Sequence, residues 1–293
     1  MNTEKTLNDS RAVRGNLGVT KQMFYTLLPL FNLIISEEMA KKPNTCKIGK
    51  GRKHTLKNTE KLFYILWYLK NYLTVDATAM VFNTSKSSAG KWFLDFLPLL
   101  LKTLARLGVV PIEKVNSAED FRRAFENETE IFIDGFERPT QRSKNEKCQR
   151  KHYSGKKKNH TRKSVIICNS KRKILVITPA KHGKLHDKKI LDKAVIPPRI
   201  PQEIAIIADT GFQGIQTNHP KTLLPMKKSK KYPLNQEEKT LNRLISSVRV
   251  VVEHAISGIK KFRAVSAVLR SKHGIDNTIT KTCCGLFNLS FIL

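Results

Sequence analysis

The sequence predicts an α/β protein in two parts: a helical part over residues 1–117 and a mixed α/β part over residues 118–293. Apolar residues recur at helical spacing in the first part. Short apolar runs alternate with helical segments in the second. With 40% hydrophobic residues, the 293-residue chain can build a substantial core.

Two strong helices are predicted near the start of the chain. Residues 20–42 place an apolar stripe on one helix face, formed by Phe24, Leu27, Leu28, Phe31, Ile34 and Ile35. A second helix begins at Asn58 and carries Leu62, Ile65, Leu66 and Leu69 at helical spacing. A segment rich in Pro, Gly and Lys, residues 41–55, predicts a linker between them.

A helix-turn-helix is predicted within residues 58–97. A short helix over 74–82, a polar turn over 83–85 and a second helix over 86–94 have the required order. Such a motif places its second helix in the major groove of DNA. The side chains expected to reach phosphates or base edges are Lys86, Ser87, Ser88 and Lys91. The alternative is a plain helical bundle with a polar corner, and the pattern alone leaves both open.

The second part predicts strands over 130–134, 163–169, 173–178 and 203–208, and helices over about 187–194 and 236–262. The first and last strands are nearly continuous apolar runs, as expected of strands buried on both faces. The long helix is predicted to pack through one stripe, formed by Leu241, Leu244, Ile245, Val248, Val252, Ala255, Ile259 and Phe262.

Three carboxylates occupy unusual positions in this part. Asp134 and Asp209 follow buried strands, and Glu253 lies beside the apolar stripe of the long helix. If the two strands are neighbours, these side chains converge, and hard cations such as Mg²⁺ relieve their mutual repulsion. Two such ions support in-line displacement at phosphorus. Alternatively, the aspartates only cap turns, and Glu253 pairs with Arg249 one helical turn before it.

The charge of the chain predicts a polyanionic partner. Fifty-four Lys and Arg face 24 Asp and Glu, giving a formal net charge of +30 and a pI near 10.1. Residues 138–163 contain eleven Lys or Arg, so this segment is expected to be a DNA-contacting loop, with a solvated disordered loop as the alternative. The expected DNA contacts are Arg138, Lys156, Lys157 and Lys158, with Arg249 and Lys260 holding the strand or forming a surface ladder of ion pairs.

Other classes of protein are disfavoured. No apolar stretch reaches the roughly 18 residues that a membrane span needs, and the polar start does not resemble a signal peptide. The five cysteines are odd in number and form no CxxC pair, which favours a reduced intracellular setting without a zinc site.

Five segments together resemble the DDE transposases of bacterial insertion sequences, in particular the insertion-sequence-five and Harbinger-like group. In chain order they are IDGFERP (133–139), YSGKKKNH (153–160), GKLHD (183–187), IADTGFQG (207–214) and RVVVEHAISGIKKFR (249–263). They are spread over the second part of the chain, and their order and spacing make the resemblance specific.

The resemblance implies a ribonuclease-H-like mixed-sheet core behind the helix-turn-helix, with Asp134, Asp209 and Glu253 as catalytic residues. It implies two Mg²⁺ ions, with Mn²⁺ as a substitute, and His186 and Asp187 in supporting roles. The implied reaction is cleavage of DNA at element ends, followed by joining of the 3′-hydroxyl to target DNA. The expected partners are terminal inverted repeats, target DNA and further copies of the chain, in the nucleoid-associated cytoplasm of a bacterium.

Two alternatives stay open. Phe136 departs from the small or hydroxylated residue expected at that position, which favours a catalytically inactive or domesticated DNA-binding protein. A ribonuclease-H-like nuclease that hydrolyses DNA without strand transfer would carry the same carboxylates.

Overall fold

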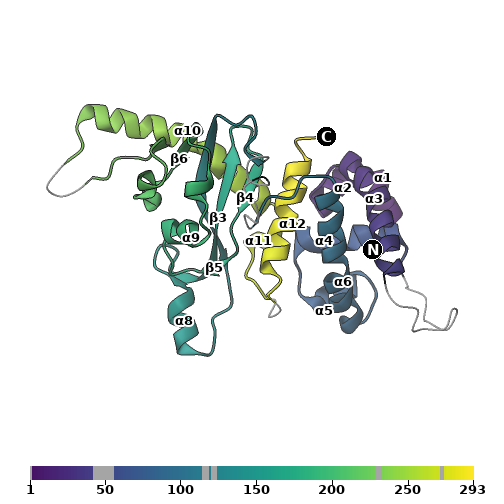
Figure 1. The fold of residues 1–293 in the computed structure, drawn as a ribbon. Coiled ribbons are helices and arrows are strands. Elements are labelled where there is room, and N and C mark those ends of the chain that lie inside the picture. The colour runs from purple at the N-terminus through teal and green to yellow at the C-terminus, as the bar shows by residue number, and fades with distance from the viewer. Residues whose placement is uncertain (1, 42–55, 114–118, 120–123, 229–232, 271–273) are drawn as a thin grey trace. The chain divides into compact units, whose positions relative to one another are not determined.

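The computed structural model describes residues 2–41, 56–113, 119, 124–228, 233–270 and 274–293, and these fold into two compact units (Figure 1). The helical unit comprises residues 1–110, 260–267 and 278–293, and the sheet unit comprises residues 111–259 and 268–277. The predicted mixed α/β class is confirmed. The predicted boundary at residues 117–118 and most of the predicted linker lie outside the described residues.

The helical unit contains eight of the described α-helices, in whole or in large part: α1 (Thr3–Asn8), α2 (Ser10–Leu17), α3 (Lys21–Ala40), α4 (Asn58–Asn71), α5 (Val75–Val81), α6 (Lys86–Arg106), α11 (Arg263–Ser266) and most of α12 (Asp276–Leu289). Both predicted long helices are present as α3 and α4. Every residue of α4 from Lys61 to Leu69 is buried, so α4 is the central helix of this unit. Polar contacts anchor it, because the Tyr64 hydroxyl donates to the Ala89 carbonyl at 2.6 Å near the start of α6.

Residues far along the chain complete the helical unit. The buried Asn288 side chain on α12 donates to the Val109 carbonyl at 2.9 Å. A Cβ on Gly18 would lie 2.8 Å from the ring of Phe262, and Gly18 has a φ of +71°. Glycine is therefore required there by both space and conformation. The sequence-based boundary assigns α12 to the second part of the chain, whereas its side chains pack in the helical unit.

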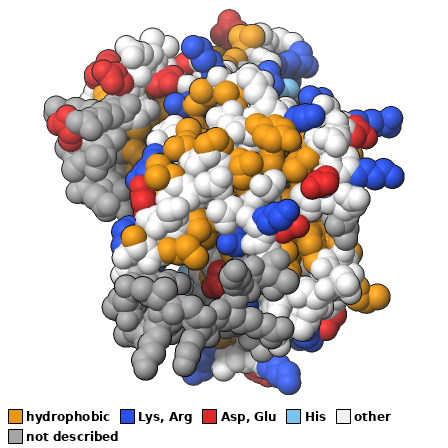
Figure 2. Space-filling view, turned by 90° about the vertical axis from the view of Figure 1, so that its right-hand side faces the viewer, with side chains coloured by type: hydrophobic (Ala, Val, Ile, Leu, Met, Phe, Trp, Pro, Cys, Tyr) orange, Lys and Arg blue, Asp and Glu red, His pale blue; other side chains and the backbone are white. Residues whose placement is uncertain are grey.

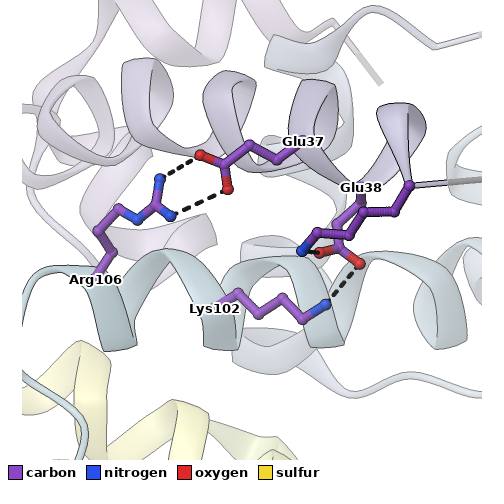
Figure 3. A network of polar contacts seen from close by, with 5 residues as sticks. Glu37, Glu38, Lys102 and Arg106 are labelled. Carbon is purple, nitrogen blue, oxygen red and sulfur yellow. Dashed lines mark hydrogen bonds and ion pairs between the residues drawn. The ribbon is translucent and has the colours of Figure 1, made fainter.

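Ion pairs join α3 to α6 at the surface of this unit (Figure 3). Arg106 binds Glu37 through both guanidinium nitrogens at 2.6 and 3.1 Å, and Lys102 lies 2.6 Å from Glu38. Lys41 bonds the other oxygen of Glu38 at 2.9 Å. Five charged residues thus form a short ladder between the two helices: Glu37 and Glu38 of α3, Lys41 directly after α3, and Lys102 and Arg106 of α6.

The predicted helix-turn-helix segments form α5, a tight turn and α6. The Ser85 hydroxyl caps α6 by accepting from the Ser88 N–H at 3.1 Å, and Asn83 adopts a φ of +47° in the turn. Both features suit the short polar connection that the motif needs. The arrangement fits a helix-turn-helix, and DNA binding by it stays a prediction.

The sheet unit holds the strands β1 (Glu130–Pro139), β2 (Tyr153–Ser154), β3 (Asn159–Asn169), β4 (Ile174–Ile177), β5 (Lys181–His182), β6 (Ala205–Ala208) and β7 (Thr222–Leu223). Its helices are α8 (Glu146–His152), α9 (Asp187–Lys193) and most of α10 (Gln236–Lys260), with 3₁₀ turns at Pro197–Arg199, Thr210–Phe212 and Ile215–Thr217. The order β2-β3-β1-β6-β7 is mixed, because β1 is antiparallel to β3 and parallel to β6.

The two faces of β1 differ in character. Strand alternation puts Ile131 and Ile133 on the face that packs against α9, where the buried core includes Ile190 and Leu191. Phe132, Asp134, Phe136 and Arg138 belong to the opposite face. The predicted burial of β1 and β6 on both faces is confirmed, since Ile131, Phe132 and Ile133 are all at most 1% exposed.

Three details differ from the predictions. β1 continues five residues beyond Asp134, because it pairs with β3 as far as Pro139. The basic segment 138–163 is not a loop: Asn145 caps α8 through a bond to the Cys148 N–H, and β2 pairs with β3. The predicted apolar stripe of α10 is buried only in part, since Leu241, Leu244 and Val248 are 46%, 59% and 40% exposed.

One face of the protein, shown in Figure 2, carries several separate apolar patches with Lys and Arg side chains between and around them. Among the described side chains of this face, the basic groups do not merge into one continuous surface. In the described part of the chain, no helix combines the length and the apolar character that crossing a membrane demands.

Candidate active site

The parallel pairing of β1 with β6 sets Asp134 beside Asp209. Ile133 lies opposite Ala208 in this register, so the next residue of each chain segment is one of the two aspartates. β6 ends at Ala208, whereas β1 continues with β3 alone on its other side. The two carboxylates therefore lie where the sheet loses a strand, which confirms the expected proximity of their strands.

Each aspartate is held in the same way. Asp134 Oδ1 accepts a hydrogen bond from the Gly135 N–H at 2.7 Å, and Asp209 Oδ1 accepts from the Thr210 N–H at 2.5 Å and from its hydroxyl at 3.1 Å. In both residues the backbone N–H that follows thus fixes one oxygen. The second oxygen, Oδ2, is left for a partner outside the strand.

That partner is Arg249 of α10. Its Nη2 lies 3.4 Å from Asp134 Oδ2 and 3.8 Å from Asp209 Oδ2, and its side chain is only 11% exposed. Both distances are long for a charge-assisted hydrogen bond, which is usually below about 3 Å. Arg249 Nε is buried without a hydrogen-bond partner among the described residues. One guanidinium thus offsets only part of the charge of the two carboxylates, and it does not form the tight bidentate pair that arginine makes with a single carboxylate.

The surroundings of Asp134 act on its charge in opposite directions. Burial raises the pKa of the Asp134 carboxyl, and the nearby Asp209 adds to that effect. The hydrogen bond from Gly135 and the positive charges of Arg249 and Lys156 lower the pKa. Burial is the largest of these effects, so the pKa of Asp134 lies above its ordinary value.

Glu253 is on the same helix as Arg249, one turn later, and is exposed. Its carboxylate makes no hydrogen bond or ion pair with any other residue that the structure describes. The alternative that Glu253 simply pairs with Arg249 is therefore not observed, because Arg249 turns to the aspartates instead. Among the described side chains, no three from His, Cys, Asp and Glu are grouped closely enough to bind one metal ion.

The aspartate pair still has a donor set suited to a divalent cation. The two Oδ2 atoms converge on a single cationic nitrogen, which shows that this position favours positive charge. Carboxylate oxygens are the ligands that Mg²⁺ and Mn²⁺ prefer. Asp134 and Asp209 are thus the residues that fit a metal ion, whereas Glu253 as a third ligand stays a prediction.

Asp187 contacts the backbone behind this pair. It is the first residue of α9, with the exposed His186 in the cap position. A Cβ built on Gly135 would lie 2.8 Å from Asp187 Oδ1. Lys163 Nζ lies 3.2 Å from Asp187 Oδ1 and 3.3 Å from Glu137 Oε1.

The predicted DNA-contacting residues of the sheet unit fall into two groups. Lys156, Lys157 and Lys158 are exposed in the turn between β2 and β3, and Lys260 is exposed at the end of α10. Arg138 is buried, with only 2% exposed, and Arg249 is engaged with the aspartates. In this conformation neither arginine is available to a phosphate, because strand alternation and helix packing turn both inward.

In the helix-turn-helix segment, Lys86, Ser87 and Lys91 are exposed. Lys86 Nζ forms an ion pair with Asp76 of α5 at 3.0 Å. Ser88 is half-buried, and the Ser85 hydroxyl donates to its oxygen at 2.9 Å. Ser87 and Lys91 are therefore the unengaged candidates for DNA contact, and Ser88 serves the helix cap.

Sequence reasoning missed the roles of Lys163 and Glu137. Lys163 was counted only as one of eleven basic residues, and Glu137 received no role. Both side chains are 8% exposed, and the Thr161 hydroxyl bonds Glu137 at 2.8 Å. A lysine two residues before the apolar run Val165–Cys168, on the same face of the strand as Val165, was the available signal, because a charge that is buried on a strand usually has a partner.

Comparisons with known proteins define the class of this site. The sequence-family model of the DDE superfamily endonucleases matches residues 133–288. This stretch contains both aspartates, Glu253 and most of the sheet unit. The chain belongs to this superfamily of endonucleases. The expected resemblance is thereby confirmed at the level of the superfamily.

A curated relative extends the similarity over nearly the whole chain. A probable transposase for insertion sequence element IS702 from Microchaete diplosiphon is 25% identical over 286 residues, covering 97% of this chain and 96% of that protein. A search of the solved structures gave no significant match.

Proposed function

We propose that this protein is a transposase of a bacterial insertion sequence, which cleaves DNA at the element's ends and joins the freed 3′-hydroxyl to target DNA. The superfamily match and the similarity to a probable transposase support it. The observation that carries the proposal is the convergence of Asp134 Oδ2 and Asp209 Oδ2 at the interrupted edge of the sheet.

The catalytic residues in this proposal are Asp134, Asp209 and Glu253, on a core of the ribonuclease-H-like type. Asp134 and Asp209 would hold divalent metal, with Glu253 as the further ligand. Bound Mg²⁺ or Mn²⁺ would supply Lewis-acid stabilisation of the negative charge that develops on the phosphoryl oxygens. The protein's own contribution is to fix one oxygen of each aspartate through the following N–H and leave the other directed at the cation.

Glu253 requires a change on binding. It lies one turn after Arg249 on α10 and is exposed. Residues four apart lie on the same side of a helix, about 6 Å along the axis. A small movement of α10 along its axis, with Arg249 leaving the carboxylates for a DNA phosphate, would bring Glu253 toward the aspartates.

DNA binding is assigned to two exposed regions. Ser87 and Lys91 on α6 are proposed to contact the terminal inverted repeats. Lys156, Lys157 and Lys158 are proposed to contact the DNA backbone, because all three are exposed in the turn between β2 and β3. Transposition brings two DNA ends together, so the proposal includes more than one copy of the chain on the DNA. The proposed location is the nucleoid-associated cytoplasm.

The proposal is tested with duplexes that carry the inverted repeats flanking this reading frame. The Asp209→Asn variant is expected to bind these duplexes as the wild type does and to lose nicking in Mg²⁺. The Asp192→Asn variant, altered at a partly exposed α9 carboxylate that pairs with Lys188, is the matched control and should nick normally. Nicking by Asp209→Asn at the wild-type rate contradicts the proposal.

The same assay separates the alternatives. Nicks without joined products would identify a nuclease that hydrolyses only. Binding without any nicking in Mg²⁺ or Mn²⁺ would identify an inactive or domesticated DNA-binding protein. Phe136 is relevant to the inactive alternative. Its side chain is 3% exposed, so a large apolar group is buried two residues after Asp134 on the same face of β1.

A further inference from the structure

The sheet unit contains a buried group of charges that neither the aspartate pair nor the DNA surface uses. Lys163 on β3 lies between two carboxylates, Asp187 of α9 at 3.2 Å and Glu137 of β1 at 3.3 Å. The side chains of Lys163 and Glu137 are each 8% exposed, and that of Asp187 is 20% exposed. Three secondary-structure elements are thus joined by one ammonium group.

Stability alone does not account for this arrangement. Removing a lysine and two carboxylates from water is costly, and apolar side chains of similar size often stabilise a protein as well or better. A buried ion pair can instead fix the relative positions of the segments that it joins, which matters when a functional site lies next to them. The neighbours of Asp187 show which site that is.

The Asp187 carboxylate rests against the backbone of both segments that carry the aspartate pair. A Cβ on Gly135, the residue after Asp134, would lie 2.8 Å from Asp187 Oδ1. A Cβ on Gly211, two residues after Asp209, would lie 3.6 Å from Asp187 Oδ2. Only glycine lets the carboxylate approach Gly135 so closely, whereas the approach at Gly211 is an ordinary van der Waals contact.

The contact at Gly135 is separated from Asp134 by a single peptide unit. The Gly135 N–H donates to Asp134 Oδ1, so a shift of this backbone moves the carboxylate directly. Glu137 is two residues further along the same face of β1, and it bonds the Thr161 hydroxyl of β3 at 2.8 Å. Lys163 therefore links Glu137 of β1 to Asp187 of α9, whose carboxylate lies close to Gly135.

We infer that Lys163 and Asp187 are positioning residues, whose largely buried ion pair holds the backbones at Gly135 and Gly211 so that Asp134 and Asp209 share one cation. The inference rests on the proposed function, since it assigns a purpose to that site. Residues behind metal ligands typically change metal affinity tenfold to a hundredfold when altered.

The test uses the full chain and Mn²⁺ as the probe, with free Mn²⁺ measured by electron paramagnetic resonance. Lys163→Met and Asp187→Asn are expected to raise the Mn²⁺ dissociation constant about tenfold or more. Lys163→Arg keeps the charge and should restore most of the affinity. In ¹H–¹⁵N spectra, the Gly135 amide should shift in Lys163→Met, because its bond to Asp134 is disturbed.

The matched control is Asp276→Asn. Asp276 is 4% exposed and pairs with Arg162, the neighbour of Lys163 on β3, at 2.6 Å. This change also breaks a buried ion pair of the sheet unit, but the pair touches neither glycine. It should lower unfolding stability while leaving Mn²⁺ affinity and the Gly135 amide unchanged.

The outcomes separate the inference from the function. If Asp209→Asn binds Mn²⁺ as the wild type does, the proposed function fails, and the inference fails with it. If Asp209→Asn loses Mn²⁺ while Lys163→Met and Asp187→Asn keep it, only the inference is overturned. Equal losses of affinity in Asp276→Asn and Asp187→Asn would also overturn it, because the effect would then be general destabilisation.

Discussion

Arg249 Nη2 lies 3.4 Å from Asp134 Oδ2, so a helix supplies the positive charge for a carboxylate at the edge of the sheet. The same nitrogen is 3.8 Å from Asp209 Oδ2. A guanidinium between two aspartates occupies the place where a metal ion would be attracted. In the proposed function, Arg249 and a divalent cation would therefore compete for the same two oxygens.

This competition predicts the behaviour of Arg249→Gln. Without added metal, the variant should lose on the order of 3 kcal/mol of unfolding free energy, because two partly buried carboxylates are left without a counter-charge. Added Mn²⁺ should then stabilise the variant more than it stabilises the wild type. Urea unfolding with and without Mn²⁺ measures both effects, and Arg243→Gln, at an exposed site of the same helix, is the control.

The exposed part of α10 gives a second prediction. Leu244 and Ile245 are adjacent, but Leu244 is 59% exposed and Ile245 is 5% exposed. Ile245→Ala should cost about 2 kcal/mol or more, whereas Leu244→Ala should change the unfolding free energy by less than about 0.5 kcal/mol. Equal costs, measured by urea unfolding, would mean that Leu244 is also covered in solution.

The turn between β2 and β3 predicts a salt effect on DNA binding. Replacing Lys156 and Lys157 by Ala should weaken binding equally for specific and unrelated duplexes, because phosphate contacts carry no sequence information. The slope of log K against log salt should become less negative by about 0.9 for each lost contact. Lys158 is left in place, since its φ of +47° would strain an alanine.

The control for that experiment is the double change Lys171→Ala and Lys184→Ala, which removes the same charge from other exposed positions. If it alters the slope as much as the Lys156 and Lys157 changes, net charge and not the turn determines the affinity. Titration of fluorescently labelled duplex at several salt concentrations supplies the slopes.

The ladder between α3 and α6 predicts a pH dependence. Hydrogen bonds from Lys102 and Lys41 lower the pKa of Glu38 from 4.5 to about 2. A lowered folded-state pKa stabilises the fold above the unfolded value, and this stabilisation disappears as the pH falls from about 4.5 to about 2. Glu38→Gln should therefore remove part of the acid sensitivity in this window. The effect should shrink in high salt, because the pair is exposed.

A buried hydrogen bond in the helical unit gives a further prediction. The Tyr64 hydroxyl donates to the Ala89 carbonyl at 2.6 Å, and burial raises the pKa of Tyr64 well above its ordinary value. Tyr64→Phe keeps the ring and should cost about 1 kcal/mol of unfolding free energy. Tyr25→Phe, at a 45% exposed ring, should be neutral. A neutral Tyr64→Phe would contradict the importance of this bond.

The longer helices and strands were predictable, because their buried apolar residues form continuous runs or recur at helical spacing in the sequence. The helices α3, α4, α9 and α10 and the strands β3, β4 and β6 were found within a few residues of their bounds, since continuous or striped apolar runs specify them. The pairing of β1 with β6 was only the condition under which the two aspartates would converge, and the structure fulfils it. The short strands β2, β5 and β7 have two residues each and carry no such period.

The parts of the site that depend on tertiary contacts were not predictable. Arg249 was expected to face DNA, but its orientation depends on the two carboxylates that come from strands about 40 and 115 residues away in sequence. The inward orientation of Arg138 and the pairing of Lys163 depend equally on neighbouring strands. Charge counted along the chain cannot distinguish a buried lysine from a solvated one.

The packing of α12 against Leu104 and Val110 has a consequence for the order of events during synthesis. The N-terminal helices leave the ribosome first, yet the unit they belong to lacks part of its interior until residues up to Leu289 are made. A ribosome-bound chain halted near residue 200 should thus hold α3, α4 and α6 in a protease-sensitive state, and release of the finished polypeptide should protect them.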